Sequence, residues 1–197
     1  TPTGVCHMDG YFICPTDEKK FIKSAIEDGL TWAAIDHSRA DGDPDGIQAM
    51  IPYKGILYPI GVNTIEAFNN AGGSDFPFVK VGGLLVGKGM SYRHAYVVTG
   101  NAFYFVGSGY GESPAIYMSN GQEADKISTD AEDYTIRQEL QKAGIEDTFG
   151  FQYSIDGAYF VGFSFPEKTL VYEIAGKTWH ERASFIDGDL VRWRPNA

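Results

Sequence analysis

An acidic loop after residue 40 carries the pattern closest to a metal site. Its residues are Asp41-Gly42-Asp43-Pro44-Asp45-Gly46, and alternating carboxylates on a tight glycine turn can converge on a hard cation such as calcium. A complete helix-loop-helix calcium site needs a bidentate Glu at the twelfth position, which is Pro52 here. Asp41, Asp43 and Asp45 are therefore a candidate calcium loop, and we favour the alternative of a solvated turn.

Two glycine-rich stretches have the spacing of nucleotide-binding loops without their other parts. In the stretch from Gly82 to Gly89, Lys88 is in place, but Gly89 stands where a hydroxyl must hold magnesium and no helix follows. Pro114 and a strand-like run follow the stretch 107–111, where a dinucleotide site needs a helix. We predict a flexible connection at 82–89, a turn at 107–111, and no cofactor.

Two further clusters have the residue types of catalytic groups. Asp36-His37-Ser38 holds all three types of a triad, but neighbours on a strand point to opposite faces and cannot hydrogen-bond in series. In Trp179-His180-Glu181-Arg182 we expect an ion pair or hydrogen-bond network at a sheet edge. A glycosidase pair would need two carboxyl groups at a defined separation, which sequence does not measure. We predict no catalytic residue.

The cysteines flank a hairpin signal, Asp9-Gly10, which is typical of a two-residue turn. Such a turn places Cys6 opposite Ile13, so Cys6 and Cys14 are diagonal and a disulfide is disfavoured. We expect both to behave as small buried hydrophobic side chains. Cys6 and His7 cannot form a zinc site without a second ligand pair.

These residues sit within a repeat. Glycines at turn positions are separated by 45, 45 and 57 residues: Gly10, Gly55, Gly100 and Gly157. A strand-like run precedes each glycine, and an aromatic strand, a β-branched strand and a more polar segment follow. This order is typical of four-stranded propeller blades. We predict an all-β, β-propeller fold whose antiparallel blades span about 5–40, 47–83, 91–128 and 149–185; a sandwich or barrel would not explain the period.

A helical insert explains the longest interval. Thr129 is an N-cap candidate, acidic residues follow it, and Lys142 and Gly144 are stop signals, so we predict a helix at 130–143. A further strand is expected to start at 189–193, and both ends look cut, as in a fragment of one propeller domain. Aromatic residues recur at equivalent blade positions and should pack in cores before they stack on sugars: Tyr11, Tyr58, Phe103, Tyr104, Tyr159 and Phe160.

The composition excludes some classes of protein. With 43% hydrophobic residues the chain is not disordered. With 16 basic against 26 acidic residues and a net charge of −10, general binding to polyanions is disfavoured. No run of about 18 apolar residues indicates a membrane-spanning helix.

Several short phrases, taken in order, resemble one family. They are Asp43-Pro44-Asp45, Thr64-Ile65-Glu66, Asp75-Phe76-Pro77-Phe78, Lys126-Ile127-Ser128-Thr129 and Lys177-Thr178-Trp179-His180-Glu181-Arg182-Ala183-Ser184. Together they resemble the packaged-DNA stabilization proteins, the tail hub or tail accessory factors of short-tailed bacteriophages, over about 29–184. We interpret the motif residues as structural: Trp32 and Trp179 between blades, and Pro44 and Pro77 in turns.

The resemblance implies a non-enzymatic virion protein that is assembled in the host cytoplasm and does not insert into membranes. It would form a homo-oligomeric ring beneath the portal and adaptor, contact the tail needle or tailspike, and hold DNA only as retained or passing cargo. The acidic balance suggests a channel lining that lets DNA slide. The alternative is a carbohydrate-binding or glycan-cleaving propeller, motivated by the aromatic residues and carboxylates.

Overall fold

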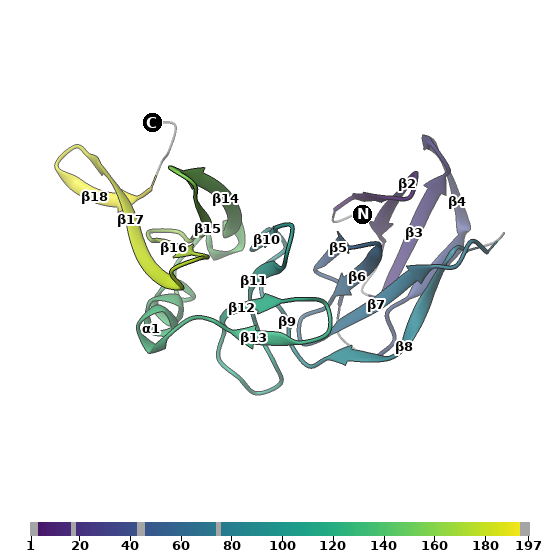
Figure 1. Cartoon of the computed structure of the whole chain (residues 1–197), viewed down its shortest axis with the longest axis horizontal. Coiled ribbons are helices and arrows are strands. Elements are labelled where there is room, and N and C mark those ends of the chain that lie inside the picture. Colours follow the sequence, from purple (N-terminus) through teal and green to yellow (C-terminus); the bar gives the residue numbers. More distant parts are fainter. Residues whose placement is uncertain (1–3, 17–18, 43–45, 74–75, 194–197) are drawn as a thin grey trace. The chain divides into compact units, whose positions relative to one another are not determined.

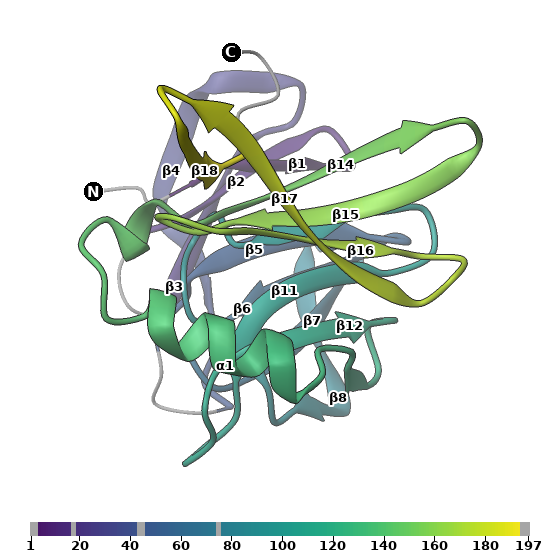
Figure 2. The same cartoon turned by 90° about the vertical axis from the view of Figure 1, so that its left-hand side faces the viewer.

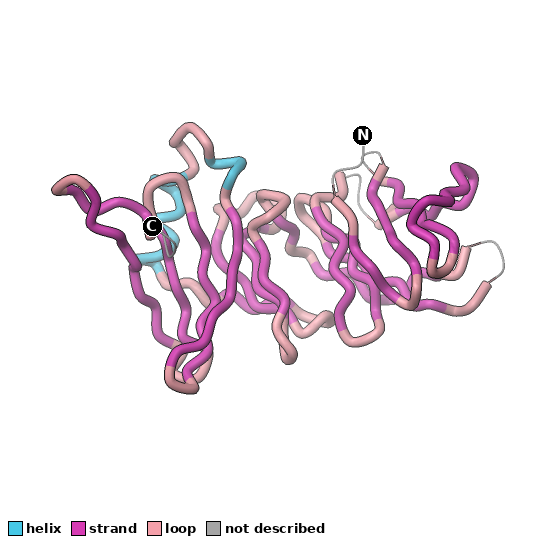
Figure 3. Tube along the Cα trace, turned by 90° about the horizontal axis from the view of Figure 1, so that it is seen from above, coloured by secondary structure: helices cyan, strands magenta, loops and turns pink. Residues whose placement is uncertain are grey.

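The computed structural model describes residues 4–16, 19–42, 46–73 and 76–193, with the side chains of 34–36 left out of the description. Its strands form four antiparallel sheets that follow one another along the chain (Figure 1). Strands and their connections make up nearly all of the chain, and helical structure is confined to one stretch (Figure 3). This confirms the all-β, β-propeller class predicted from the repeat.

The first two sheets have the same topology. The first has the order β1-β2-β3-β4, and the second has the order β5-β6-β7-β8. Their strands are β1 (Cys6–Met8), β2 (Tyr11–Pro15), β3 (Lys20–Ala25), β4 (Asp28–Arg39), β5 (Ala49–Tyr53), β6 (Ile56–Ile60), β7 (Ile65–Asn70) and β8 (Phe78–Val86). Strand β8 continues past residue 83, the expected end of the second blade.

Along the chain, the helical insert lies between the third and fourth sheets. Their orders are β10-β11-β12-β13 and β14-β15-β16-β17-β18. The elements from the third sheet on are β10 (Tyr96–Val98), β11 (Phe103–Ser108), β12 (Ala115–Ser119), β13 (Ala124–Lys126), α1 (Asp130–Glu139), a 3₁₀ turn (Ile145–Asp147), β14 (Phe149–Ile155), β15 (Ala158–Ser164), β16 (Thr169–Glu173), β17 (Thr178–Ile186) and β18 (Asp189–Arg192). The two-residue β9 (Gly89–Met90) precedes them.

The strand expected from residue 189 is β18, and it pairs antiparallel with β17 as a fifth strand of its sheet. Strand β18 covers only residues 183–186 of β17, so among the described strands the Trp179–Arg182 segment pairs with β16 alone and lies at a sheet edge, as expected. Sequence period alone did not show the pairing with β18 because β17 and β18 are joined by one more tight turn, Asp187-Gly188, outside the 45-residue repeat.

The hairpin turns follow the sequence signal in three of the four repeats. Both residues have positive φ at Asp9-Gly10 (51° and 82°), Lys54-Gly55 (49° and 75°) and Asp156-Gly157 (51° and 83°). That conformation matches the strand twist and favours glycine at the second position. The third repeat differs, because Thr99 closes a longer loop by hydrogen bonds to both backbone groups of Ala102, and Gly100 keeps a negative φ.

The chain divides into two compact units, each described on its own. Unit 1 comprises 1–90, 108–112 and 119–124, and unit 2 comprises 91–107, 113–118 and 125–197. The core of unit 1 joins the first two sheets through edge-to-face rings: Phe21 lies 5.2 Å from Phe68 and 5.7 Å from Phe76, and Phe76 lies 6.0 Å from Phe78. Such ring pairs add to the burial of apolar area.

The core of unit 2 includes the helix. Helix α1 lies beside the sheet that contains β15 and β16 (Figure 2). Its Ile136 is fully buried in one cluster with Val161 and Phe163 of β15. The helix starts as predicted: Thr129 precedes it, and the Glu132 carboxylate accepts the Thr129 N–H at 2.9 Å. It ends earlier, at Glu139, so Ala143 lies exposed in the following turn and does not share the buried face.

Candidate functional site

The candidate calcium loop lies partly outside the described residues, because Asp43 and Asp45 are not described. Gly42 is held by Glu66, a 2% exposed carboxylate on β7. Glu66 Oε1 accepts the Gly42 N–H at 2.5 Å, and its Oε2 lies 2.6 Å from Lys80 Nζ. A Cβ at residue 42 would lie 2.8 Å from Glu66 Oε1, so glycine suits this contact.

Within the described part of the chain, no cluster of His, Cys, Asp and Glu side chains is arranged to hold a metal ion. The calcium loop at Asp41, Asp43 and Asp45 stays a prediction. The sequence analysis did not predict that Glu66 would hold Gly42 and Lys80. The one indication was its position between two apolar residues, Ile65 and Ala67, which are both buried. A buried carboxylate needs a cation and hydrogen-bond donors, and the loop and β8 provide them.

The stretch with phosphate-loop spacing has a structural explanation. Residues 82–86 belong to β8, so the flexible connection expected there is wrong. Lys88 forms an ion pair with Glu112. Gly89 approaches the backbone of residues 61–63 so closely that a Cβ would lie 2.3 Å from Asn63 N. Glycine at 89 thus serves packing, and the lysine is neutralised rather than aimed at a phosphate.

The residues of the Trp179–Arg182 segment have separate partners in unit 2. The Trp179 ring packs against Tyr172, with centroids 4.9 Å apart and planes tilted by 44°. Its indole N–H donates to the Ile127 carbonyl at 2.9 Å, which ties β17 to the chain after β13. Glu181 pairs with Lys168, as expected for an ion pair. His180 lies 3.2 Å from Thr178 Oγ1. Arg182 lies over the ring of Phe160 at 6.0 Å. These contacts anchor the sheet.

Trp32 differs from Trp179. Its indole N–H donates to the carbonyl of Gly29 in the same strand, β4, at 2.8 Å. The expected packing between blades is found for Trp179, whereas for Trp32 it stays a prediction. In the same sheet, His37 is exposed and pairs in register with Ile22, and the Asp36 side chain is not described. Pro77 precedes β8 and accepts the Ala71 N–H at 2.7 Å, and Pro44 lies outside the description.

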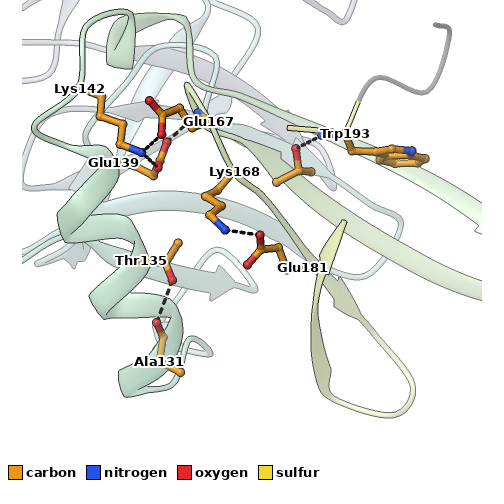
Figure 4. A network of polar contacts seen from close by, with 9 residues as sticks. Ala131, Thr135, Glu139, Lys142, Glu167, Lys168, Glu181 and Trp193 are labelled. Atoms are coloured by element: carbon orange, nitrogen blue, oxygen red, sulfur yellow. Dashed lines mark hydrogen bonds and ion pairs between the residues drawn. The ribbon is translucent and has the colours of Figure 1, made fainter. Parts of the chain in front are cut away.

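Carboxylates on α1 fix the helical insert at both ends. Asp133 accepts the Ser128 hydroxyl at 2.6 Å and pairs with Lys126 at 2.5 Å. The Glu139 side chain is 1% exposed. Its carboxylate accepts a hydrogen bond from the Lys142 ammonium at 2.7 Å and another from the Glu167 N–H at 2.8 Å (Figure 4). Hydrogen bonds to Glu139 and Glu167 raise the pKa of Lys142. The sequence signal was available: Asp133 and Glu139 share the apolar helix face with Ile136.

The cysteines form no disulfide, and Cys14 is buried as predicted, whereas Cys6 is only half-buried. Both are free thiols, and Cys6 is paired in register with Ile13. Burial, with a smaller contribution from Cys14, raises the pKa of the Cys6 thiol to about 12. Neither thiol is therefore activated for nucleophilic chemistry at neutral pH.

A cleft of about 630 Å³ lies in unit 2, between the loop after β10 with β11 on one side and the β14–β15 hairpin on the other. The backbone of the two sides is joined where Gly150 N donates to the His94 carbonyl at 2.8 Å. The cleft is lined by neutral residues: Thr99, Gly100, Asn101, Tyr104, Gln152, Tyr153, Ser154, Gly157, Tyr159, Phe160, Ile174 and Ala175. Sequence reasoning did not find this cleft, because residues 50 positions apart form its walls.

The recurring aromatic residues divide into two groups. As predicted, Tyr58, Phe103, Tyr104 and Phe160 are at most 9% exposed, and the half-buried Tyr11 packs against the core of unit 1. Tyr159, however, is 65% exposed at the mouth of the cleft, which corrects its assignment to a core.

The ordered succession of four antiparallel sheets defines a β-propeller protein. The family model described as "Bacteriophage P22 Gp10, beta-propeller" (Phage_stabilise) matches residues 1–197, and the chain belongs to this family. It is thus a structural phage protein of the packaged-DNA stabilization family, as the resemblance of its sequence phrases implied. A search of curated proteins found no match. In the part of the chain that the structure describes, no helix is long and apolar enough to cross a membrane.

Two solved structures are similar at low sequence identity. One is a GH43 glycoside hydrolase engineered to display endo-xylanase and exo-arabinofuranosidase activity, with a TM-score of 0.41 and 12% identity over 90% of this chain and 40% of that chain. The other is the N-terminal domain of Nup159, with a TM-score of 0.46 and 11% identity over 93% and 48%. The chain spans less than half the length of either.

Proposed function

We propose that this protein is a non-enzymatic part of the phage tail hub, assembled in the host cytoplasm beneath the portal and adaptor. There it closes the DNA channel, stabilises the packaged genome and later forms part of the delivery conduit. The observation that carries this proposal is the family match over the full chain. In this role the chain works through protein interfaces and needs no cofactor.

The positions of the motif residues support a structural role. Glu66 holds the Gly42 loop and Lys80, Phe76 and Phe78 belong to the ring cluster of unit 1, and Trp179 ties two sheets of unit 2 together. Each side chain is engaged in holding the fold. A role of these residues in holding the fold accounts for the short, separated motifs of the sequence, and no active site is needed to explain them.

The charge distribution supports DNA as sliding cargo. Five lysines are paired with carboxylates: Lys80, Lys88, Lys126, Lys142 and Lys168. A paired ammonium gives less counterion release on meeting a phosphate, and the net charge is −10. We therefore propose that the channel surface repels DNA enough to let it move. A continuous lining of unpaired Lys and Arg in the assembled hub would contradict this.

Exposed apolar side chains support assembly with other chains. Phe185 and Leu190 face each other across β17 and β18 and are 73% and 76% exposed. Exposed apolar pairs of this kind are costly in water and favour burial at an interface. We propose that the protein forms a homo-oligomeric ring and contacts the portal–adaptor complex and the tail needle or tailspike.

Mass measurement in solution tests the proposal. The protein is sedimented alone and with the portal–adaptor complex of the same phage. We expect a discrete heavier species that contains both components, weakened by Phe185→Asp and unchanged by Val79→Asp, a matched change at a 50% exposed site on β8. A protein that stays monomeric and never joins the complex would contradict the hub assignment.

A further inference from the structure

We propose that the cleft of unit 2 is a binding site for a neutral saccharide, which it holds without cleaving. This goes beyond the hub role and is independent of it. The cleft is about 630 Å³, within the range of roughly 300–1,000 Å³ typical of small-ligand sites. Its two sides are joined by the backbone, because Gly150 of β14 donates to the carbonyl of His94, just before β10.

Close packing brings the two sides of the cleft together at Gly150. A Cβ at Gly150 would lie 2.4 Å from the Tyr96 carbonyl oxygen, so β14 can approach β10 there only because residue 150 is glycine. Gln152, two residues further along β14, lines the cleft. The Asp156-Gly157 turn then places its glycine in the wall of the cleft.

The polar groups of the lining suit a neutral ligand rich in hydroxyl groups. The side-chain amides of Asn101 and Gln152 both donate and accept hydrogen bonds, and the Ser154 hydroxyl does the same. All three residues are exposed. A sugar hydroxyl is likewise both donor and acceptor, so amides and hydroxyls complement it.

None of the described residues that line the cleft is acidic or basic. Phosphate and carboxylate ligands are recognised by Arg or Lys, so the lining disfavours both. Glycoside hydrolysis needs a pair of carboxyl groups beside the scissile bond, which this lining does not supply. The same site chemistry thus selects a neutral saccharide and argues against its cleavage.

The aromatic residues provide the apolar part of the site. The ring of Tyr153 stacks on Phe160 at 4.9 Å with 12° between the planes, on the opposite face of the β14–β15 hairpin from Gln152, Ser154 and Tyr159, and so stiffens the wall that carries them. Tyr159, in register opposite Ser154, leaves its ring 65% exposed at the mouth. An aromatic face next to hydrogen-bonding groups matches the alternating C–H and O–H surface of a pyranose ring.

Binding is tested on an array of neutral oligosaccharides, with an anionic polysaccharide such as polygalacturonate for comparison. Positive glycans are then titrated by saturation-transfer NMR. We expect at least one neutral glycan to bind and to be recovered intact, with the anionic chain bound more weakly. Tyr159→Ala should reduce affinity about tenfold and Gln152→Ala about fivefold, as expected for loss of one stacking or one hydrogen-bonding group.

Matched variants separate binding from folding. Tyr159→Phe keeps the ring and should retain most of the affinity. Tyr134→Ala and Gln138→Ala change exposed residues of α1 outside the cleft and should leave affinity within about twofold. Tyr159→Ala should still join the portal–adaptor complex, so failure of this site and failure of the hub proposal are distinguishable. Absence of any neutral-glycan binding, preference for the anionic chain, or unchanged binding by both cleft variants would overturn the proposal.

Discussion

The two units solve the same packing problem in different ways. In unit 1 the two sheets meet through a cluster of aromatic rings that includes Phe21, Phe68 and Phe76. In unit 2 the sheets are joined by backbone contacts at Gly150, by the Trp179 indole and by the inserted helix. The helix supplies apolar side chains to the core, and one recurring aromatic residue, Tyr159, remains exposed beside a cleft.

The comparison shows how a repeat gains a new surface. Where every recurring ring is needed for packing, the blade pair is a scaffold. In unit 2 the inserted helix, which the buried carboxylates Asp133 and Glu139 hold in place, contributes part of the core. The blade pair can therefore leave an aromatic residue exposed for a binding site. We expect substitutions in unit 1 to affect mainly stability, and those at the cleft of unit 2 to affect mainly binding.

The largest effect is expected from the ring cluster of unit 1. Phe68→Ala removes a fully buried ring in contact with Phe21 and should lower the free energy of unfolding by about 4 kcal/mol. Urea denaturation measures this loss. Leu30→Ala, at a side chain that is 95% exposed, is the control and should change it by less than about 0.5 kcal/mol. Equal effects would show that the ring cluster does not hold unit 1 together.

The next effect is expected at the helix of unit 2. Glu139→Ala leaves the Glu167 N–H and the Lys142 ammonium without their buried acceptor, at a cost of about 2 kcal/mol after allowing for the partial exposure of Lys142. Glu139→Gln keeps an acceptor and should cost less. Glu123→Ala, at an exposed acidic residue, is the matched control. Thermal unfolding measures the stability of the three variants, and we expect Glu139→Ala to lose the most and Glu123→Ala the least. The reverse order would contradict the role of Glu139 in anchoring the helix.

A pH effect is expected in unit 1 from the Cys6 thiol. The folded state keeps the Cys6 proton because its pKa is raised to about 12, whereas an exposed thiol ionises near pH 9. The stabilisation is therefore complete below pH 9 and is lost as pH rises from 9 towards 12, by at most about 1.4 kcal/mol per pH unit. Denaturation of wild type and Cys6→Ala from pH 8 to 10.5 measures the difference. Parallel curves would show that the thiol does not control this loss.

The smallest effect compares the two tryptophans of the repeated Thr-Trp pair. Trp179→Phe removes the hydrogen bond to Ile127 that joins two sheets and should cost about 1 kcal/mol or slightly more. Trp32→Phe removes an exposed hydrogen bond within strand β4 and should cost less than about 0.5 kcal/mol. Urea denaturation of the two variants measures their free energies of unfolding. A larger loss of stability for Trp32→Phe than for Trp179→Phe would contradict this comparison.

Much of the fold could be predicted because its signals are local. Asp9-Gly10 and Asp156-Gly157 specify tight turns by backbone conformation alone, and Thr129 with Glu132 specifies a helix start. The pairing of β18 with β17, the extension of β8 and the exposure of Tyr159 depend on partners distant in sequence. The cleft has the same origin, because its walls come from separate sheets and no short pattern encodes their separation.

The most direct test of the central claim is retention of DNA in filled phage heads. Heads assembled with and without this protein are treated with nuclease, and the protected fraction of the genome is measured. We predict that heads with the protein keep their DNA protected, and that heads without it lose DNA to the nuclease unless the purified protein is added back. Equal protection in both preparations would contradict a role in stabilising the packaged genome.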